Sequence, residues 1–292
     1  MYVIFGASGK VGASSAAALR KAGKAVRAVV RNPAQGEALA RIGCEVAIAD
    51  LDDLRSIRRA LDGAQAAQLI CPVALQASDA ASAMRAMIHN AAQALSAHPG
   101  MRVLAVSDYG AELESGTGIT MLYRELERQF AQAVAHLTLL RSAEHMQNWG
   151  RVLPVALATG YLSTLHAPAS TPFPTVSAHD VGTIAAQLLL EQEQRDDTKV
   201  RVVSVEGPHR YSAEDAARLL GEVCGREMRV HVLPRQEWAA TLSRSGINEA
   251  LATLIMETND AQNSGRIGAE AGTELRRGTT GLREVLAALV AA

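Results

Sequence analysis

A glycine-rich turn between an apolar segment and a helical segment constrains the fold more than any other feature of the sequence. The apolar run "YVIF" at residues 2–5 is followed by Gly6, Gly9 and Gly12 in "GASGKVG", and residues 13–22 have a helical pattern. In a strand–turn–helix context, such glycines permit a tight turn, a close backbone approach to a pyrophosphate, and close packing of helix on strand, respectively. The spacing is GxxGxxG rather than GxGxxG, and a turn that binds no ligand is the alternative.

Apolar runs and helical segments alternate through the first half of the chain. The expected strands are residues 2–5, 25–30, 45–50, 66–71, 102–107 and 137–142, and the expected helices are residues 13–22, 33–42, a segment capped by Asp52 or Asp53 and closed by Gly63, 79–96 and 120–135. Short links between such elements favour a parallel sheet with helices on both faces. The sequence therefore predicts an α/β fold with a Rossmann-type, doubly wound parallel sheet.

The alternation breaks after Trp149. Residues 150–176 contain four prolines and little periodicity, and Asp180 is the expected N-cap of a helix that ends near residue 191. We expect residues 1–150 to form the dinucleotide-binding domain, with residues 177–206 returning to it. Residues 151–292 are expected to form a smaller α+β lobe.

Within this smaller lobe, two strands and a helix are expected before a last stretch of helices and loops. The strands are residues 201–207 and 228–234. Ser212 and Asp215 have the spacing of a capping box for a helix over residues 213–223, which Gly225 would close.

The end of the second expected strand bears on the choice of cofactor. NAD-specific sites place a carboxylate there for the ribose hydroxyls, whereas NADP-specific sites place an arginine near the 2′-phosphate. This chain has Arg31 and Asn32 at that point, and Lys10 lies within the glycine turn. The sequence therefore predicts binding of NADP(H), although Arg31 could instead be a solvated surface residue.

The ends of the third and fourth strands complete the expected cofactor site. Asp50 and Leu51 would lie near the adenine, and Cys71 and Pro72 near the nicotinamide ribose, although Asp50 could simply begin a turn and Cys71 could be a small buried residue. The expected cofactor-binding residues are Gly6, Ala7, Ser8, Gly9, Lys10, Val11, Gly12, Arg31, Asp50, Leu51, Cys71 and Pro72.

The tyrosine–lysine pair of many short-chain dehydrogenases is absent. Tyr123 lies on the helix after the fifth strand, but the fourth residue after it is Glu127, and no lysine lies between Lys24 and Lys199. A lysine would lower the pKa of the tyrosine, whereas a carboxylate one helical turn away is expected to raise it.

Other proton donors are therefore expected at the carboxyl edge of the sheet, where ligands bind in open α/β folds. Ser107 and Tyr109 follow the fifth strand, and His145 and Asn148 follow the sixth. We expect Tyr109, Ser107 and His145 to be the catalytic candidates. The alternative is that these are loop-capping or structural polar residues.

Composition excludes several other classes of function. The net charge of −1 gives no reason to expect binding to nucleic acid or to an anionic membrane. The cysteines, Cys44, Cys71 and Cys224, are far apart, and no Cys or His cluster has metal-ligand spacing. We expect no metal site, no membrane segment and a cytoplasmic location.

Taken together, these motifs resemble the NmrA-like family of atypical short-chain dehydrogenase/reductases. The likeness rests on "GASGKVG", "VVRNP" and "ADLDDLRSIRRALDGAQA", and continues through "LERQF", "LTLLRSAEHMQNW", "HDVG" and "EGPHRYSAEDAARLLGEVCGREMRV". Arg141 and Asn148 match the Arg…Asn pattern of the family after the sixth strand. Where enzymes of the wider family often carry a lysine, this chain has Tyr123 or Arg124, which puts reduction of ordinary ketones in doubt.

The resemblance implies an NADP-binding Rossmann domain with a smaller lobe over the nicotinamide. Some members look like NADPH-dependent quinone reductases, so one expectation is reduction of quinones or similar reactive electrophiles. Other members resemble redox sensors that bind the dinucleotide without turnover, for which a protein partner is expected. A sugar-nucleotide epimerase or dehydratase ranks last, because such enzymes normally need the tyrosine–lysine pair.

Overall fold

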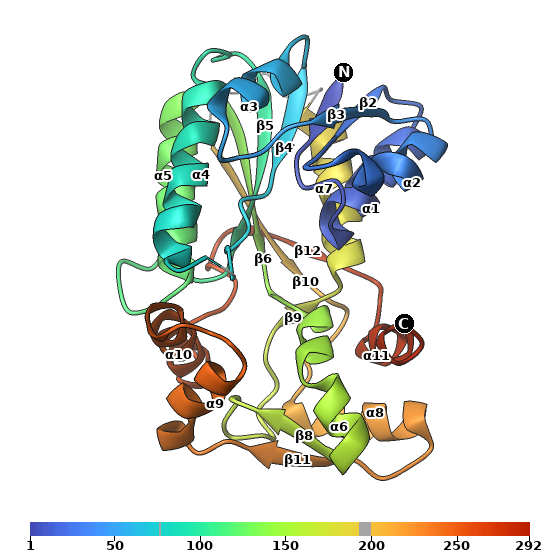
Figure 1. Ribbon diagram of the computed structural model, residues 1–292, viewed down its shortest axis with the longest axis vertical. Helices are drawn as coiled ribbons and strands as arrows, with labels where there is room; N and C mark the ends of the chain where they lie inside the picture. Colours follow the sequence, from blue (N-terminus) through green and yellow to red (C-terminus); the bar gives the residue numbers. More distant parts are fainter. Residues whose placement is uncertain (76, 193–199) are drawn as a thin grey trace.

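A parallel sheet forms the centre of the computed structural model, which describes residues 1–75, 77–192 and 200–292 (Figure 1). The 8-stranded sheet has the order β12-β10-β6-β5-β4-β1-β2-β3, and all neighbouring pairs are parallel. Its strands are β1 (Tyr2–Ile4), β2 (Val26–Val30), β3 (Glu45–Ile48), β4 (Ala66–Leu69), β5 (Arg102–Asp108), β6 (His136–Ser142), β10 (Arg201–Glu206) and β12 (Glu274–Arg277).

The strand order reverses between β1 and β4, which is the topological switch point of a doubly wound sheet. The ends of the expected strands shift by one or two residues, but each of the six strands expected in the first half is present. The predicted Rossmann-type fold class is therefore confirmed.

Helices cover both faces of the sheet, as Figure 1 shows. One face carries α1 (Lys10–Lys21), α2 (Glu37–Arg41) after the short η1 (Pro33–Gly36), and α7 (Ala178–Gln192). The other carries α3 (Leu54–Leu61), α4 (Ala80–Leu95) and α5 (Thr120–Ala133). Apolar side chains on alternate positions of the strands pack into the two cores, so the continuous apolar runs in the sequence reflect burial on both sides.

Below the carboxyl edge of the sheet lie shorter elements. They include β7 (Glu144–His145) paired with β9 (Thr175–Val176), η2 (Met146–Arg151), α6 (Leu153–Thr159), β8 (Tyr161–Thr164) paired with β11 (Arg229–Val232), α8 (Ala213–Cys224), η3 (Arg235–Glu237), α9 (Trp238–Arg244), α10 (Glu249–Asn263) and α11 (Leu282–Val290). Of these, η2, α6, β8, α8, β11 and α11 pack around a third apolar core. The Ser212–Asp215 capping box and the left-handed Gly225 at the end of α8 are both present, as the sequence predicted.

One expectation about this region is wrong. The proline-rich residues 150–176 contain α6, and its Pro154 lies in the first turn, where the missing proline N–H costs nothing. Asp180 does not cap α7, which begins at Ala178. The Asp180 carboxylate instead accepts hydrogen bonds from the backbone N–H (2.8 Å) and the hydroxyl (2.9 Å) of Thr280.

The sheet also gains an unexpected edge strand, β12. Its sequence "ELRR" has no apolar run, but Glu274 forms an ion pair with Arg201 of β10, and Arg276 forms one with Glu191 of α7.

None of the described helices is both long and apolar enough to cross a membrane. Lys199, the fourth lysine of the sequence, lies outside the described residues.

Candidate active site

The glycine turn connects β1 to α1 at the switch point of the sheet. Gly6 has a φ of +68°, which L-residues with side chains rarely adopt. A Cβ atom at Gly12 would lie 2.3 Å from the carbonyl oxygen of Gly6, so helix and strand approach too closely for any side chain there. Gly9 is the N-cap of α1 and adds no side chain over the free N–H groups, and the first turn carries no carboxylate. The turn therefore offers an uncapped helix N-terminus to an anion.

A cavity of about 370 Å³ opens over this turn. It brings together Gly6, Ser8, Gly9, Lys10, Val11, Gly12, Arg31, Asp50, Leu51 and Pro72, which the sequence singled out for cofactor binding, and adds His145, Gln147 and Asn148. The carboxyl ends of β1 to β4 thus supply most of this wall, which is where dinucleotides lie in such folds.

Two of the expected cofactor residues do not line the cavity. Ala7 and Cys71 are fully buried in the two cores, on opposite faces of the sheet. Burial raises the pKa of the Cys71 thiol to about 12, so this cysteine is an inert packing residue. The prediction that these two residues contact the cofactor is therefore wrong.

Two cationic side chains stand at the cavity without partners. Among the described residues, no ion pair or side-chain hydrogen bond engages the Arg31 guanidinium or the Lys10 ammonium, and both residues are exposed. Asn32 caps η1 by accepting a hydrogen bond from the Gln35 N–H (3.2 Å). Two carboxylates, Asp50 and Asp52, line the cavity just beyond the end of β3, and Asp50 accepts a hydrogen bond from the Asp52 N–H (3.1 Å). Free cations and free helix N–H groups fit a phosphorylated dinucleotide.

A second cavity, of about 290 Å³, adjoins the first. Both are lined by Val11, Ile70, His145 and Asn148, so the two spaces meet at these four residues. Its other walls come from the ends of β5 and β6, from Tyr123 of α5 and from one face of α10. The pairing of β7 with β9 holds His145 between the two cavities.

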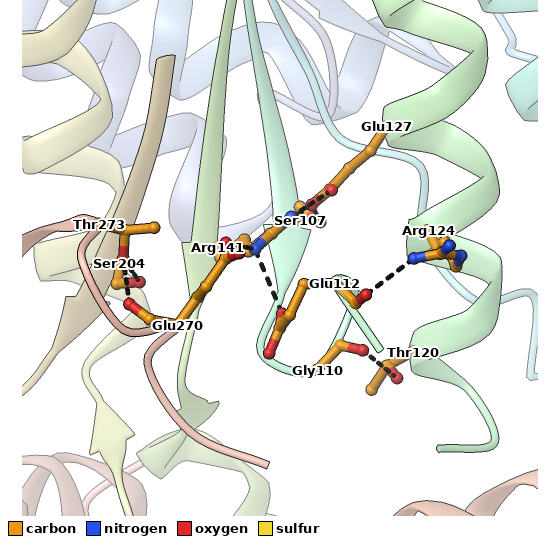
Figure 2. A network of polar contacts seen from close by, with 10 residues as sticks. All are labelled: Ser107, Gly110, Glu112, Thr120, Arg124, Glu127, Arg141, Ser204, Glu270 and Thr273. Carbon is orange, nitrogen blue, oxygen red and sulfur yellow. Dashed lines mark hydrogen bonds and ion pairs between the residues drawn. The ribbon is translucent and has the colours of Figure 1, made fainter. Parts of the chain in front are cut away.

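Ser107 lines the second cavity, but its hydroxyl is already engaged. Its Oγ donates to the Glu127 carboxylate (2.6 Å), and that carboxylate receives a two-pronged contact from the Arg141 guanidinium (2.8 and 2.7 Å) (Figure 2). Ser107 is therefore a structural donor, and the prediction that it donates to a substrate carbonyl is wrong.

Figure 2 shows that Arg141 gathers further acidic groups. Its Nη1 atom contacts Glu112 (3.2 Å) and Glu270 (2.5 Å), so one buried arginine holds carboxylates from three separate segments. Arg124 adds a hydrogen bond to the Glu112 carbonyl (2.8 Å). This network joins α5, β6 and the segment before β12.

Tyr109 does not reach either cavity. Its side chain is 2% exposed and belongs to the core on the α1 and α7 face. Burial and the neighbouring Glu206 raise the pKa of its phenol far above the usual value. The prediction that Tyr109 contacts the acceptor is therefore wrong, because the chain has left the strand at this residue and turns at Gly110.

His145 is at the predicted place but not in the predicted protonation state. Burial lowers the pKa of its imidazole to about 4. The ring is therefore neutral at physiological pH, and it can form a hydrogen bond but cannot act as an imidazolium acid.

Tyr123 lines the second cavity, and its pKa is raised, as the sequence predicted. The cause differs from the expected one: burial is the largest effect, followed by Asp108 and Cys71. Glu127 is not among these causes, and its carboxylate is paired with Arg141.

The sequence interpretation missed two carboxylates in the second cavity. Asp108, the last residue of β5, has its pKa raised to about 7, mainly by burial and further by Glu144 and Glu112, against the Tyr109 N–H. Glu144 is held below its usual pKa: burial opposes ionisation, but hydrogen bonds from His166 and Asn148 outweigh it. Asp108 directly follows Ser107. Its position at the end of a strand is the one sequence signal that could have identified it as a site residue.

The polar face of α10 was also missed. Thr258, Asn259 and Gln262 line the second cavity, although this helix lies more than a hundred residues beyond β6. No local pattern connects it to the sheet edge. Among residues 1–75, 77–192 and 200–292, no group of three His, Cys, Asp or Glu side chains could hold a metal ion.

The fold and the first cavity define a dinucleotide-binding protein. A model of the NAD(P)H-binding family matches residues 6–192, which is more than half of the chain. The chain therefore belongs to the NAD(P)H-binding family, in agreement with its resemblance to NmrA-like, atypical short-chain dehydrogenase/reductases.

Individual relatives extend the likeness over nearly the whole chain. Quinone oxidoreductase 2 of Escherichia coli (strain K12) is 26% identical over 271 residues, covering 91% of this chain and 89% of that protein. The E. coli NADPH-dependent quinone oxidoreductase solved with NADPH has a TM-score of 0.80 at 24% identity, over 99% of this chain and 100% of the other. Triphenylmethane reductase from Citrobacter sp. has a TM-score of 0.79 at 19% identity, over 100% and 99%. The two structures share the fold of this chain.

Proposed function

We propose that this protein is an NADPH-dependent reductase of quinones or similarly reactive conjugated acceptors. The observation that carries the proposal is the junction of the two cavities at Val11, Ile70, His145 and Asn148. A cofactor in the first cavity would present its nicotinamide at this junction, next to the space for an acceptor. The similarity to quinone oxidoreductase 2 supports the same activity.

NADPH is proposed over NADH because of the charges at the first cavity. The side chains of Arg31 and Lys10 have no partner among the described residues. Arg31 occupies the position at which NAD-specific sites carry a carboxylate, and such a carboxylate would repel a 2′-phosphate. A planar guanidinium binds phosphate through paired, charge-assisted hydrogen bonds.

When bound, the cofactor supplies a hydride. The chain positions the cofactor and the acceptor and excludes water from the space between them. The first turn of α1 would hold the pyrophosphate, Arg31 would hold the 2′-phosphate, and the neutral His145 and Asn148 would border both bound molecules. The side chains Val73, Ile119 and Ile255 give the acceptor cavity an apolar part, against which a conjugated ring can pack.

Reactive acceptors are favoured because the tyrosine–lysine acid is absent. A positioned general acid contributes about 10²–10⁴-fold to a rate, so its loss is tolerated best where the acceptor accepts hydride readily. A redox sensor without turnover has no need for a second cavity beside the nicotinamide, and we do not favour it.

Steady-state oxidation of NADPH, followed at 340 nm, tests the proposal with 1,4-benzoquinone, 1,4-naphthoquinone, benzaldehyde and cyclohexanone. We expect turnover with both quinones and little with the aldehyde or ketone. Gly9→Val, which should not bind the cofactor, is the matched control for direct reaction of NADPH with quinones. Equal rates in the two proteins would contradict the proposal.

A further inference from the structure

The second cavity contains a carboxyl group that neither the glycine turn nor the Arg141 network uses. Asp108 ends β5 and lines the cavity beside Tyr123 and His145. Its side chain is partly exposed, and the exposed part faces this cavity. His145, which lines both cavities, marks the side from which the cofactor would approach.

The other cavity groups are poorly suited to donate a proton. Ser107 is committed to Glu127, and Tyr109 is outside the cavity. His145 is neutral near pH 7 because burial lowers its pKa. Tyr123 holds its proton too tightly, since burial and Asp108 raise its pKa.

We propose that the carboxyl group of Asp108 is the proton donor to the acceptor oxygen in the second cavity. This inference rests on the proposed reductase function. As the acceptor gains a hydride, and with it two electrons, from NADPH, the O–H bond of the Asp108 carboxyl breaks and an O–H bond forms on the acceptor oxygen. The resulting Asp108 carboxylate regains a proton from water after the product leaves.

The charged groups around Asp108 support a protonated carboxyl near neutral pH. Glu144 on β7 stays ionised through its contact with His166 (3.3 Å) and repels a second negative charge. Glu112, in the loop after β5, acts in the same direction, although Arg141 compensates part of its charge.

Within the described part of the chain, no cation lowers the pKa of Asp108. Arg151 of η2 lines the same cavity but is exposed, and it lowers the pKa of Glu144 and of His145 instead. The α10 wall contributes only uncharged side chains, namely Ile255, Thr258, Asn259 and Gln262. With these surroundings, burial raises the pKa of Asp108 to about 7.

The first test is the pH profile of kcat for the wild type and for Asp108→Asn, which has the same shape and no acidic proton. A proton donor must be protonated to act, so we expect wild-type kcat to fall as pH rises through about 7. Asp108→Asn should be about tenfold or more slower at pH 6, with a flat profile. The ratio of wild-type kcat to Asp108→Asn kcat should increase across a series of benzoquinones as the oxygen that takes the proton becomes more basic.

Two control variants separate this role from a structural one. Tyr123→Phe, a change within the acceptor cavity, should leave the pH at which kcat falls where it is in the wild type, whatever its effect on the rate, because the phenol stays protonated throughout. Asp62→Asn, an exposed carboxylate after α3, should match the wild type. Turnover with the same pH profile in wild type and Asp108→Asn would refute the donor role alone. No turnover of any acceptor by the wild type would refute the proposed function and the donor role together.

A second readout needs neither cofactor nor acceptor. In the unfolded chain the Asp108 carboxyl has an ordinary pKa near 3.9 and is ionised at both pH 5.5 and pH 8.5. In the folded protein it is mostly neutral at pH 5.5 and must ionise in the cavity at pH 8.5, so the wild type loses stability over this interval relative to Asp108→Asn. We expect the melting temperature of Asp108→Asn to exceed that of the wild type by several degrees more at pH 8.5 than at pH 5.5. An equal difference at the two pH values would overturn the assignment.

Discussion

At the end of β2, a single side chain is expected to determine which dinucleotide is preferred. Arg31→Ala should weaken NADPH binding by about 1.5–3 kcal/mol, roughly a tenfold to hundredfold rise in Kd, because a charge-assisted contact with the 2′-phosphate is lost. NADH lacks this phosphate, so its Kd should change little. Titration of nicotinamide fluorescence with both cofactors measures the two effects.

A matched control for this substitution is available on the same side of the sheet. Arg41→Ala removes an exposed guanidinium at the end of α2, away from the residues that line the cavity, and should leave both affinities unchanged. A loss of similar size for NADPH and NADH in Arg31→Ala would mean that this arginine does not contact the 2′-phosphate.

Individual site residues were predictable where the backbone decides their position. Gly6, Gly9 and Gly12 follow directly from the strand–turn–helix context, and Arg31 from the end of a strand. The side chain just beyond a strand was not predictable, because alternation stops where the strand stops. Within β5, Ser107 turns toward α5 and Asp108 lines the cavity, whereas Tyr109, past the end of the strand, enters the core on the α1 and α7 face.

At the scale of elements, Gly9 and Gly12 have different roles where β1 meets α1. A Cβ at Gly12 would meet the Gly6 carbonyl oxygen at 2.3 Å, whereas one at Gly9 would meet it at 3.3 Å and otherwise points toward the cavity. Gly12→Ala should therefore lower both stability and cofactor binding. Gly9→Val should largely preserve the fold and abolish binding of both NADPH and NADH, because its side chain occupies the phosphate space.

Thermal melts and fluorescence titrations of the two variants check this contrast. The expected pattern is a melting temperature several degrees lower for Gly12→Ala, and a near-normal one for Gly9→Val with no measurable affinity. Near-normal NADPH affinity in Gly9→Val would show that the glycine turn is not the phosphate site.

Elements with apolar runs were predictable, and elements stabilised by distant partners were not. The strands of the Rossmann sheet are buried on both faces, so their composition alone marks them. By contrast, β12 is held by its ladder with β10 and by ion pairs such as Arg201–Glu274, and α6 begins at Leu153 within a proline-rich stretch. Neither signal is visible before the fold brings the partners together.

At the scale of the whole molecule, one buried carboxylate ties α7 to the segment that leads into α11. Asp180 accepts two hydrogen bonds from Thr280, one from the backbone N–H and one from the hydroxyl. Asp180→Ala should lower the free energy of unfolding by about 1–3 kcal/mol, because it leaves both donors without their partner. Urea denaturation followed by circular dichroism measures the loss.

Thr280→Val removes only part of the same contact, since it loses the hydroxyl donor and keeps the backbone N–H. We expect a smaller loss than for Asp180→Ala. Equal stability of Asp180→Ala and the wild type would show that this link does not hold the two segments together.

The proposed division into a dinucleotide-binding domain and a smaller lobe at residue 150 stays a prediction, because β10 and β12 belong to the sheet while α8 and α11 pack in the third core.

If the protein is a reductase, hydride passes from NADPH in the first cavity to an acceptor in the second. A single-turnover, stopped-flow experiment tests this transfer most directly, with protein in excess over NADPH that carries deuterium on one face of C4, and with 1,4-benzoquinone as acceptor. We expect loss of absorbance at 340 nm in one exponential phase, slowed severalfold by deuterium on one face only, and absent in Gly9→Val. Tight binding of NADPH with oxidation no faster than in buffer would contradict it.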